Sequence, residues 1–212
     1  MATVIRSAEP CDADLLGWAC VMAARSQFRR GWFDIVLQRD EAFVLEFAKC
    51  LTIAKARSWW HWSLFHVAEV DGVPASAMCG FGDARVYHAS GEAMAEASAK
   101  MNIDSAEQSQ QWPRGAFIIS TATSEPGAWT IENVATREAF WGTGVTQALL
   151  AKELDVARAA GFKRAQISFF IGNARAENAY RKTGFVFAEE KRAPDFEAVM
   201  GTPGTIRLVR DL

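Results

Sequence analysis

A glycine-bearing turn is the first feature of this 212-residue sequence whose residue types could do chemistry. The β-prone run 129–136 leads into Trp141-Gly142-Thr143-Gly144-Val145-Thr146, which opens an amphipathic helix. A helix N-terminus presents unpaired backbone N–H groups, and glycines let a bulky anion approach the backbone. The turn therefore predicts an anion site suited to a pyrophosphate. Glycines kept for steric reasons alone would explain the turn by itself about as well.

Two well-known phosphate-binding patterns do not fit this turn. A P-loop requires Gly-Lys-Ser/Thr at the helix start, and a dinucleotide-binding fold requires Gly-x-Gly-x-x-Gly. Neither pattern occurs at 141–146. A nucleotide-dependent transferase therefore ranks last among the functions considered.

A second group of residues, 173–185, reads Asn-Ala-Arg-Ala-Glu-Asn-Ala-Tyr-Arg-Lys-Thr-Gly-Phe. Asn173 suits a helix N-cap, and Gly184 suits the end of the same helix. Tyr180 lies two turns into this helix, where it can bury its ring and offer its hydroxyl to a partner. A core tyrosine on a capped helix is the alternative interpretation.

The elements that must position these residues follow one another in a clear order. We expect a strand at 129–136, a helix at 144–160 ended by Gly161, a strand at 164–170 and a helix at 174–183. Two final strands are expected at 185–188 and 205–209. The segment 189–204 between them is long enough to form a lid.

The N-terminal half predicts helices followed by a hairpin. A first helix is expected at 12–28, and a second is capped by Asp40 and ends near Arg57. Asp71-Gly72 joins two β-prone runs, 62–70 and 73–81, into a hairpin. Residues 84–113 are interpreted as an insertion with a helix at 91–101, and the apolar run 116–122 as a strand.

Composition and charge exclude several classes of partner. The 23 basic and 25 acidic residues leave a formal charge of −2, which is unsuited to nucleic acid. No window resembles a membrane span or a secretion signal, and the four cysteines and three histidines lack metal-ligand spacing. We expect a cytoplasmic protein with reduced thiols, no membrane partner and no metal. The sequence leaves open whether the chain forms a homodimer.

Taken together, the two groups of residues resemble the GNAT N-acetyltransferase superfamily. The run 133–150 is similar to that family's strand and pyrophosphate turn. Residues 173–185 resemble its helix with the pattern N-x-x-A-x-x-x-Y-x-x-x-G-F, which is the more specific of the two. Two positions depart from the family: Trp141 stands at the basic or amide position of the turn, and Thr146 at its final small position. Thr146 could add a hydroxyl donor to a phosphate, whereas Trp141 supplies no such polar contact.

The resemblance implies one α/β domain spanning residues 1–212. It has a central mixed β-sheet, helices on both faces and a V-shaped splay between the two strands that hold coenzyme A. The expected parts are N-terminal helices and a hairpin (1–82), an insertion (84–113), a CoA-binding core (129–185) and C-terminal strands (185–210).

The resemblance also implies the reaction, in which acetyl-CoA donates its acetyl group directly to the primary amine of a small molecule or peptide. Tyr180 is the expected general acid and Glu132, on the strand before the turn, the expected base. The alternative is that Glu132 faces solvent or an ion-pair partner, because the sequence does not fix which way this strand faces. Glu125 and His66 are weaker candidates for the base. Trp32 and Phe33 are expected to border the acceptor, together with residues 189–204. The expected cofactor-binding residues are Val134, Ala135, Thr136, Trp141, Gly142, Thr143, Gly144, Val145, Thr146, Asn173 and Tyr180. The alternative from another class is a noncatalytic acyl-CoA-binding or sensor protein of the same fold.

Overall fold

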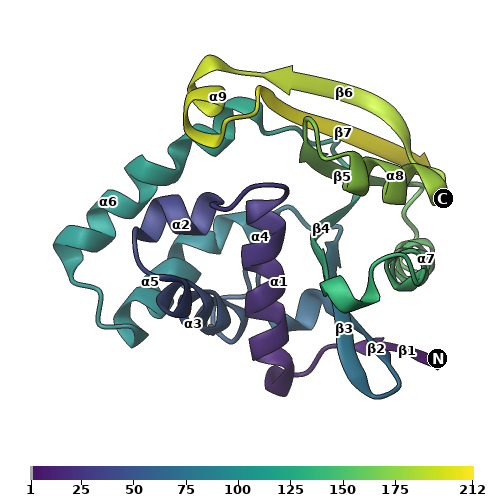
Figure 1. Ribbon diagram of the computed structural model, residues 1–212, viewed down its shortest axis with the longest axis horizontal. Coiled ribbons are helices and arrows are strands. Elements are labelled where there is room, and N and C mark those ends of the chain that lie inside the picture. Colours follow the sequence, from purple (N-terminus) through teal and green to yellow (C-terminus); the bar gives the residue numbers. More distant parts are fainter. Residues whose placement is uncertain (1) are drawn as a thin grey trace.

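A seven-stranded mixed β-sheet runs through the computed structural model, which describes residues 2–212 (Figure 1). The strand order is β1-β2-β3-β4-β5-β7-β6, and all neighbours are antiparallel except β4 and β5. The strands are β1 (Thr3–Ser7), β2 (Phe65–Val70), β3 (Val73–Phe81), β4 (Trp129–Thr136), β5 (Arg164–Phe170), β6 (Val186–Arg192) and β7 (Gly204–Asp211).

Helices cover both faces of this sheet, with α1 packed on one face of β3 and β4 and α7 on the other (Figure 1). The α-helices are α1 (Ala13–Arg25), α2 (Trp32–Leu37), α3 (Glu41–Thr52), α4 (Arg85–His88), α5 (Ser90–Lys100), α6 (Ser105–Gly115), α7 (Val145–Ala159), α8 (Ala174–Lys182) and α9 (Pro194–Met200). Short 3-10 helices are η1 (Pro10–Asp12), η2 (Trp62–Leu64), η3 (Ala116–Thr121) and η4 (Glu138–Phe140). Within residues 2–212, no helix is long and apolar enough to span a membrane.

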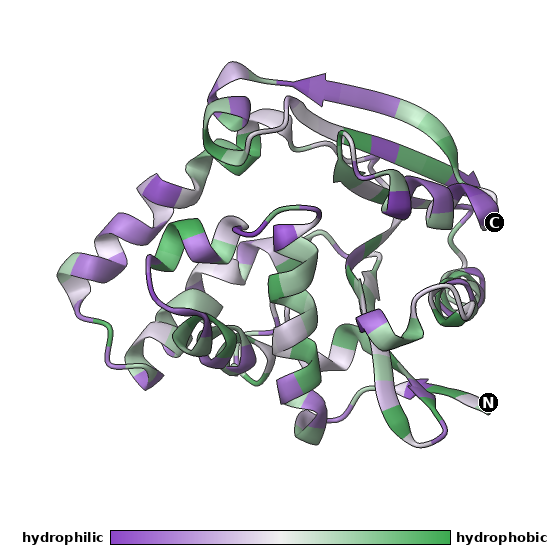
Figure 2. Cartoon of the chain, viewed as in Figure 1, coloured by the Kyte–Doolittle hydropathy of each residue, from purple (hydrophilic) through white to green (hydrophobic). Residues whose placement is uncertain are grey.

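Each face of the sheet buries its own hydrophobic core. One core joins α1, α3 and α5 to the sheet around Leu16 and Phe47, and the other joins α7 and α8 to it around Ile131 and Leu150. Figure 2 shows the corresponding apolar colour on α1, whereas α6 and the edge strand β6 are largely hydrophilic. A Cβ on Gly17 would lie 2.6 Å from the backbone nitrogen of Lys49, so this glycine permits the close approach of α1 to α3.

The parallel strands β4 and β5 separate after a short contact. They pair only where Trp129–Ile131 faces Ala165–Ile167, while β5 pairs with β7 along its whole length. The β3–β4 register shifts between Ala77 and Cys79, which places both Asn133 and Val134 opposite a single β3 residue. Asn133 has a positive φ of 53°, as expected for a bulged residue. The predicted mixed sheet with splayed central strands is therefore confirmed.

The predicted order of strands and helices over residues 129–185 is confirmed closely. Strands β4 and β5 have the expected ends, and α7 and α8 lie within one residue of theirs. Asn173 caps α8, since its Oδ1 accepts from the backbone N–H of Ala176 at 3.0 Å. Gly161 and Gly184, each with a φ of 86°, follow the two helices in the left-handed conformation that ends them.

The strand predicted at 116–122 is wrong, because this segment forms the 3-10 helix η3. The helical backbone of α6 continues through Gly115 and Ala116. The segment contacts the edge strand β6 without pairing with it, and the hydroxyl of Thr205 on β7 donates to the carbonyl of Thr121 at 2.6 Å. Phe117 instead packs against Phe196 of α9 at a ring-centroid distance of 5.7 Å. The apolar run therefore packs against α9 and does not join the sheet.

The lid predicted at 189–204 is also wrong. Strand β6 continues to Arg192, and α9 occupies most of the remainder. Phe196 of α9 is fully buried against Phe117 and Phe170. The segment is a packed element of the domain, and it does not line the cleft described below.

The N-terminal half differs from the prediction in several details, one of which is that the second long helix, α3, ends at Thr52 and not near Arg57. Strand β1 was not predicted, and it pairs antiparallel with β2. The first run of the hairpin begins at Phe65, because η2 occupies 62–64. The polar segment after α5 forms α6, whose cap Asp104 accepts from the N–H of Glu107 at 2.8 Å. The expected break between the first two long helices holds the short helix α2.

Candidate functional site

The splay of β4 and β5 opens one large cleft of about 2310 Å³. Its walls come from the two strands, the start of α8, the segment from the end of α1 to α2, and the insertion between β3 and β4. Most of the predicted site residues line it, namely Trp32, Phe33, Glu132, Val134, Ala135, Thr136, Trp141, Thr146, Asn173 and Tyr180. Residues far apart in the sequence are thus brought to one cavity.

Glu132 lines this cleft from strand β4. It lies on β4 opposite Cys79, one residue before the bulge, and it is only partly exposed. The hydroxyl of Tyr87 donates to its Oε1 at 3.4 Å. Burial raises the pKa of Glu132 to about 7, although the Tyr87 hydrogen bond acts in the opposite direction. Such a carboxylate can accept and release a proton near neutral pH.

Tyr180 lines the same cleft from the side of α8. Its ring is 6% exposed and packs edge-on against Phe169 with centroids 6.0 Å apart. Within residues 2–212 its hydroxyl has no hydrogen-bond partner. Burial, and then the negative charge of Glu132, raise the pKa of Tyr180 above its ordinary value. The hydroxyl therefore stays protonated and free to donate.

The turn before α7 has the geometry of an anion cradle. Gly142 and Gly144 have φ values of 77° and 86°, and a Cβ on either would meet no atom within 4 Å. In the described chain, the backbone N–H groups of Gly142 and of residues 144–147 have no acceptor. Gly142, Gly144, Thr146 and Gln147 border a smaller cavity of about 460 Å³ that Arg175 and Lys182 of α8 also line. The predicted anion site is thus a recess with open N–H groups and two cations.

The side chains of Thr143 and Val145 do not line either cavity. Val145 is buried in the core beside α7, and the hydroxyl of Thr143 donates to the carbonyl of Phe140 at 2.8 Å. These two predicted cofactor-binding residues can therefore contribute through their backbones only.

Trp141 has a role that its departure from the family pattern did not predict. Its indole Nε1 donates to the carbonyl of Thr136 at 2.8 Å. The guanidinium carbon of Arg175 lies 3.4 Å from the centroid of its ring, which is a cation–π contact. Trp141 thus holds the side chain of Arg175, which borders both cavities.

The hydroxyl of Thr146 is already engaged inside the protein. Ser76 donates to the carbonyl of Ala135 at 2.9 Å, so it must accept from Thr136, whose oxygen lies 2.8 Å away. Because the hydroxyl proton of Thr136 is donated to Ser76, the Thr136 oxygen can only accept in its 2.7 Å contact with the Thr146 hydroxyl, and Thr146 must donate. Thr146 is therefore not available as a hydroxyl donor to a phosphate in this arrangement, which corrects that expectation.

Asn173 joins α8 to the segment that follows α1. Besides capping α8, its Nδ2 donates to Ser26 Oγ at 2.7 Å. Gln27 Nε2 adds a bond to the carbonyl of Ile171 at 3.1 Å. These bonds hold the segment between α1 and α2 across the open end of the splay.

The weaker base candidates lie outside the cleft. Nδ1 of His66 lies 2.7 Å from the fully buried Glu153 of α7, which also accepts from Trp129 Nε1 at 3.0 Å. Glu125 pairs with Arg164 and Arg207. Both residues are tied into structural contacts away from Glu132.

Sequence reasoning missed three kinds of residue in the cleft: Tyr87, Arg175, and the pair Trp59 and Trp60. Tyr87 is one of only two tyrosines in the chain, and the other is Tyr180. That scarcity is a signal, but nothing in the sequence brings the insertion to Glu132. Arg175 lies within the second motif, two residues after the predicted cofactor-binding residue Asn173, and that position is the signal that could have identified it.

Comparisons with known proteins agree with this geometry. A family model described as "Acetyltransferase (GNAT) family" matches residues 32–185. A search of curated protein sequences finds no match.

Solved structures resemble the whole chain at low sequence identity. One described as "The crystal structure of acetyltransferase" has a TM-score of 0.70 and 19% identity, covering 98% of each chain. An N-acetyltransferase from Staphylococcus aureus Mu50 has a TM-score of 0.65 and 18% identity, covering 98% of this chain and 100% of its own. An N-acetylglutamate synthase from Neisseria gonorrhoeae, solved with coenzyme A and N-acetyl-glutamate, has a TM-score of 0.51 and 17% identity, covering 100% of this chain and 35% of its own. These similarities show the fold.

Proposed function

Because this chain belongs to the GNAT acetyltransferase family, whose members are acyl-CoA-dependent N-acetyltransferases, we propose that it transfers the acetyl group of acetyl-CoA to a primary amine. The transfer is direct, with both substrates held in one cleft. The observation that carries this proposal is the pairing of Glu132 and Tyr180 in a cleft that continues to the anion cradle before α7. One group accepts a proton and the other donates one.

Acetyl-CoA fits the residues present. Its diphosphate would bind the open N–H groups between Gly142 and Gln147, where the glycines leave room for it. The free edge of β4 beyond Ile131 would pair with the amides of the pantetheine arm. Val134 is better suited to this than the carbonyl of Thr136, which already accepts from Trp141.

The proposed chemistry needs two proton movements. Glu132 accepts a proton from the ammonium form of the acceptor, so that the nitrogen lone pair can attack the thioester carbon. The new C–N bond forms as the C–S bond breaks, and the amide nitrogen releases its second proton to water. Tyr180 gives its proton to the departing sulfur and regains one from solvent. Holding both substrates together contributes about 7–11 kcal/mol in favourable intramolecular cases.

A noncatalytic acyl-CoA-binding protein is the less favoured alternative. Such a protein has no use for a carboxylate with a pKa of about 7 or for a free tyrosine hydroxyl beside it. Incubating the chain with acetyl-CoA and a library of amines, with CoA thiol release as the readout, decides between the two. Turnover with at least one amine supports the enzyme, whereas tight acetyl-CoA binding with no turnover supports the sensor.

Gly144→Val is expected to abolish measurable acetyl-CoA binding in calorimetry. A β-branched side chain is strained at a φ of 86°, and its methyl groups would fill the approach to the open N–H groups. Gly161→Val is the matched control, because Gly161 has the same φ and equally empty surroundings but lies outside both cavities. Unchanged affinity in Gly144→Val would move the diphosphate away from this turn.

Arg175→Ala is expected to weaken acetyl-CoA binding about 10- to 100-fold, because a hydrogen bond to a charged group is worth about 1.5–3 kcal/mol. Trp141→Ala should reproduce part of this loss, since it frees Arg175 from its stacking partner. Arg181→Ala, on the same helix but paired with Glu177, is the control. If Arg175 binds the diphosphate, the Arg175→Ala variant should lose affinity for CoA and for dephospho-CoA by the same factor. A loss confined to CoA would assign Arg175 to the 3′-phosphate instead.

A further inference from the structure

A continuous row of aromatic side chains leads away from Glu132 along the wall of the cleft. Tyr87, which donates to Glu132, has its ring centroid 5.5 Å from that of Trp59. Trp59 lies 4.9 Å from Trp60, and Trp60 lies 6.1 Å from Trp32. All four residues line the cleft. We call Tyr87, Trp59, Trp60 and Trp32 the aromatic row.

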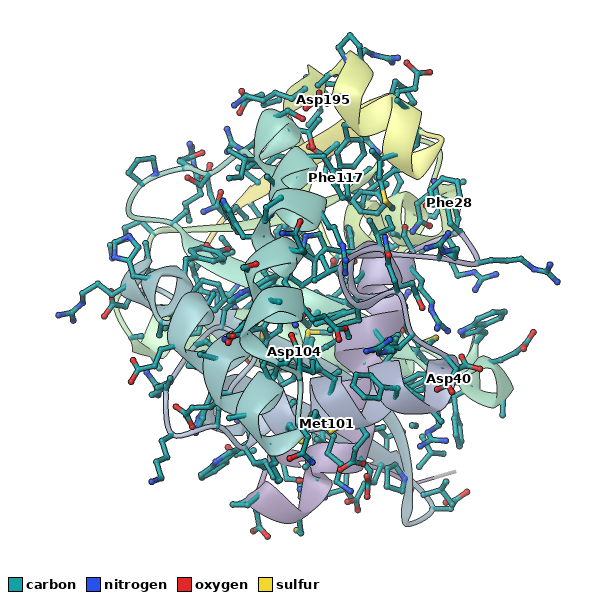
Figure 3. All side chains as sticks on the ribbon, turned by 90° about the vertical axis from the view of Figure 1, so that its left-hand side faces the viewer. Phe28, Asp40, Met101, Asp104, Phe117 and Asp195 are labelled. Atoms are coloured by element: carbon teal, nitrogen blue, oxygen red, sulfur yellow. The ribbon has the colours of Figure 1, made fainter. Side chains whose placement is uncertain are left out.

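The insertion supplies further apolar surface to the same cleft. Trp112 of α6 and Ile119 of η3 are 62% and 56% exposed and both line it. Figure 3 looks onto α6, which rises from Asp104 toward Phe117. Gly115 fixes this helix to the aromatic row, since its carbonyl accepts from Trp32 Nε1 at 3.0 Å. A Cβ on Gly115 would lie 2.7 Å from the same indole nitrogen. Exposed apolar surface gathered in a cleft is typical of a ligand site.

Most carboxylates in this part of the cleft are paired, whereas Arg29 and Arg30, which also line it, form no ion pair within residues 2–212. Asp34 and Glu41 both bind Arg25. In residues 2–212, Glu132 and Glu138 are the cleft carboxylates without an ion pair, and Glu138 lies on η4 beside the anion cradle. The aromatic row therefore offers one carboxylate, at its inner end, and none along its length. A ligand with a single cationic amine fits this pattern, whereas a second cation would lack a partner.

On the basis of the proposed function, we propose that the acceptor is a primary amine joined by a short chain to an aromatic ring. Its ammonium group meets Glu132, and its ring lies along the aromatic row. Stacked and edge-on ring contacts favour a flat aromatic body over an aliphatic chain of similar size. The positive charge also gains from the neighbouring ring faces. Diamines and polyamines are the classes that this arrangement disfavours, because their second cation has no partner along the aromatic row.

The test measures kcat/KM at saturating acetyl-CoA for phenethylamine, tryptamine, n-butylamine, putrescine, spermidine and glycinamide. The two arylalkylamines are expected to exceed every other amine by at least tenfold. Trp59→Leu should then lower kcat/KM for phenethylamine about tenfold and leave that for n-butylamine nearly unchanged. Trp62→Leu is the matched control, because Trp62 lies three residues away and does not line the cleft. Trp112→Ala, at an exposed position, provides a second variant that should fold normally.

Each other outcome has a defined meaning. Faster acetylation of putrescine, spermidine or glycinamide would overturn the aromatic acceptor and leave the acetyltransferase standing. The aromatic acceptor would also be overturned if Trp59→Leu and Trp112→Ala each lowered kcat/KM for phenethylamine and for n-butylamine by the same factor. Acetyl-CoA binding without turnover of any amine would overturn the proposed function and this inference together.

Discussion

Glu132→Gln is expected to lower kcat/KM by about 10²–10⁴-fold near neutral pH, the usual contribution of a general base. Glutamine keeps the size of the side chain and can still meet the Tyr87 hydroxyl, so the change removes mainly the ability to take a proton. The measurement is thiol release with a fixed amine. Glu138→Gln, at another unpaired carboxylate of the cleft, is the matched control and should keep full activity.

The pH profile separates a base from a structural carboxylate. Because Glu132 has a pKa of about 7, parent activity should fall below that pH as the carboxylate becomes protonated. The variant should lack this limb and recover at high pH, where the amine loses its proton to water unaided. A constant ratio of variant to parent activity across pH would assign proton removal to water or to another group.

Stability gives an independent check with a defined sign. The pKa of Glu132 is raised on folding from 4.5 to about 7, so the folded state holds its proton more tightly than the unfolded state. This contribution is complete below about pH 4.5, and it is lost as the pH rises through 7. Relative to the parent, Glu132→Gln should therefore gain thermal stability between these pH values. A Tm difference that does not vary with pH would mean that burial does not raise this pKa.

Tyr180→Phe is expected to lower kcat by about 10²–10⁴-fold, in line with the loss of a general acid. KM should change far less, because the hydroxyl matters chiefly as negative charge develops on the departing sulfur. The ring contact with Phe169 is retained, so folding should be unaffected. Steady-state kinetics with chemistry shown to be rate-limiting is the measurement, and an unchanged kcat would leave Tyr180 a packing residue.

Tyr87→Phe is the natural control for that experiment, because Tyr87 is the only other tyrosine and also faces Glu132. Its hydroxyl lowers the pKa of Glu132 by hydrogen bonding. Removing it should move the acid limb of the pH profile to higher pH while keeping kcat at its high-pH plateau. Tyr180→Phe is thus expected to lower kcat, whereas Tyr87→Phe is expected to shift the pH profile.

Local signals were sufficient to predict the strands and helices of residues 129–185. The spacing of apolar residues, the helix caps and the helix-ending glycines all act within a few residues. They predict the strands at 129–136 and 164–170 and the helix that follows each strand. The same local signals failed at 116–122, where an apolar, β-prone run became helical because the helical backbone of α6 continues into it and Phe117 packs against α9. Propensity gave way to tertiary context there.

The sequence by itself determined the glycine turn before α7, the cap at Asn173 and the places of Glu132 and Tyr180 in β4 and α8, because each depends on residues close together in the chain. Only the tertiary structure decided what faces these residues. The register shift in β4 and its short pairing with β5 open the cleft, and the insertion brings Tyr87 to Glu132 across 45 positions of sequence. Burial, which gives Glu132 its pKa, depends on all of these contacts at once. Such contacts arise from chain segments meeting in space, and no local pattern of residues encodes them.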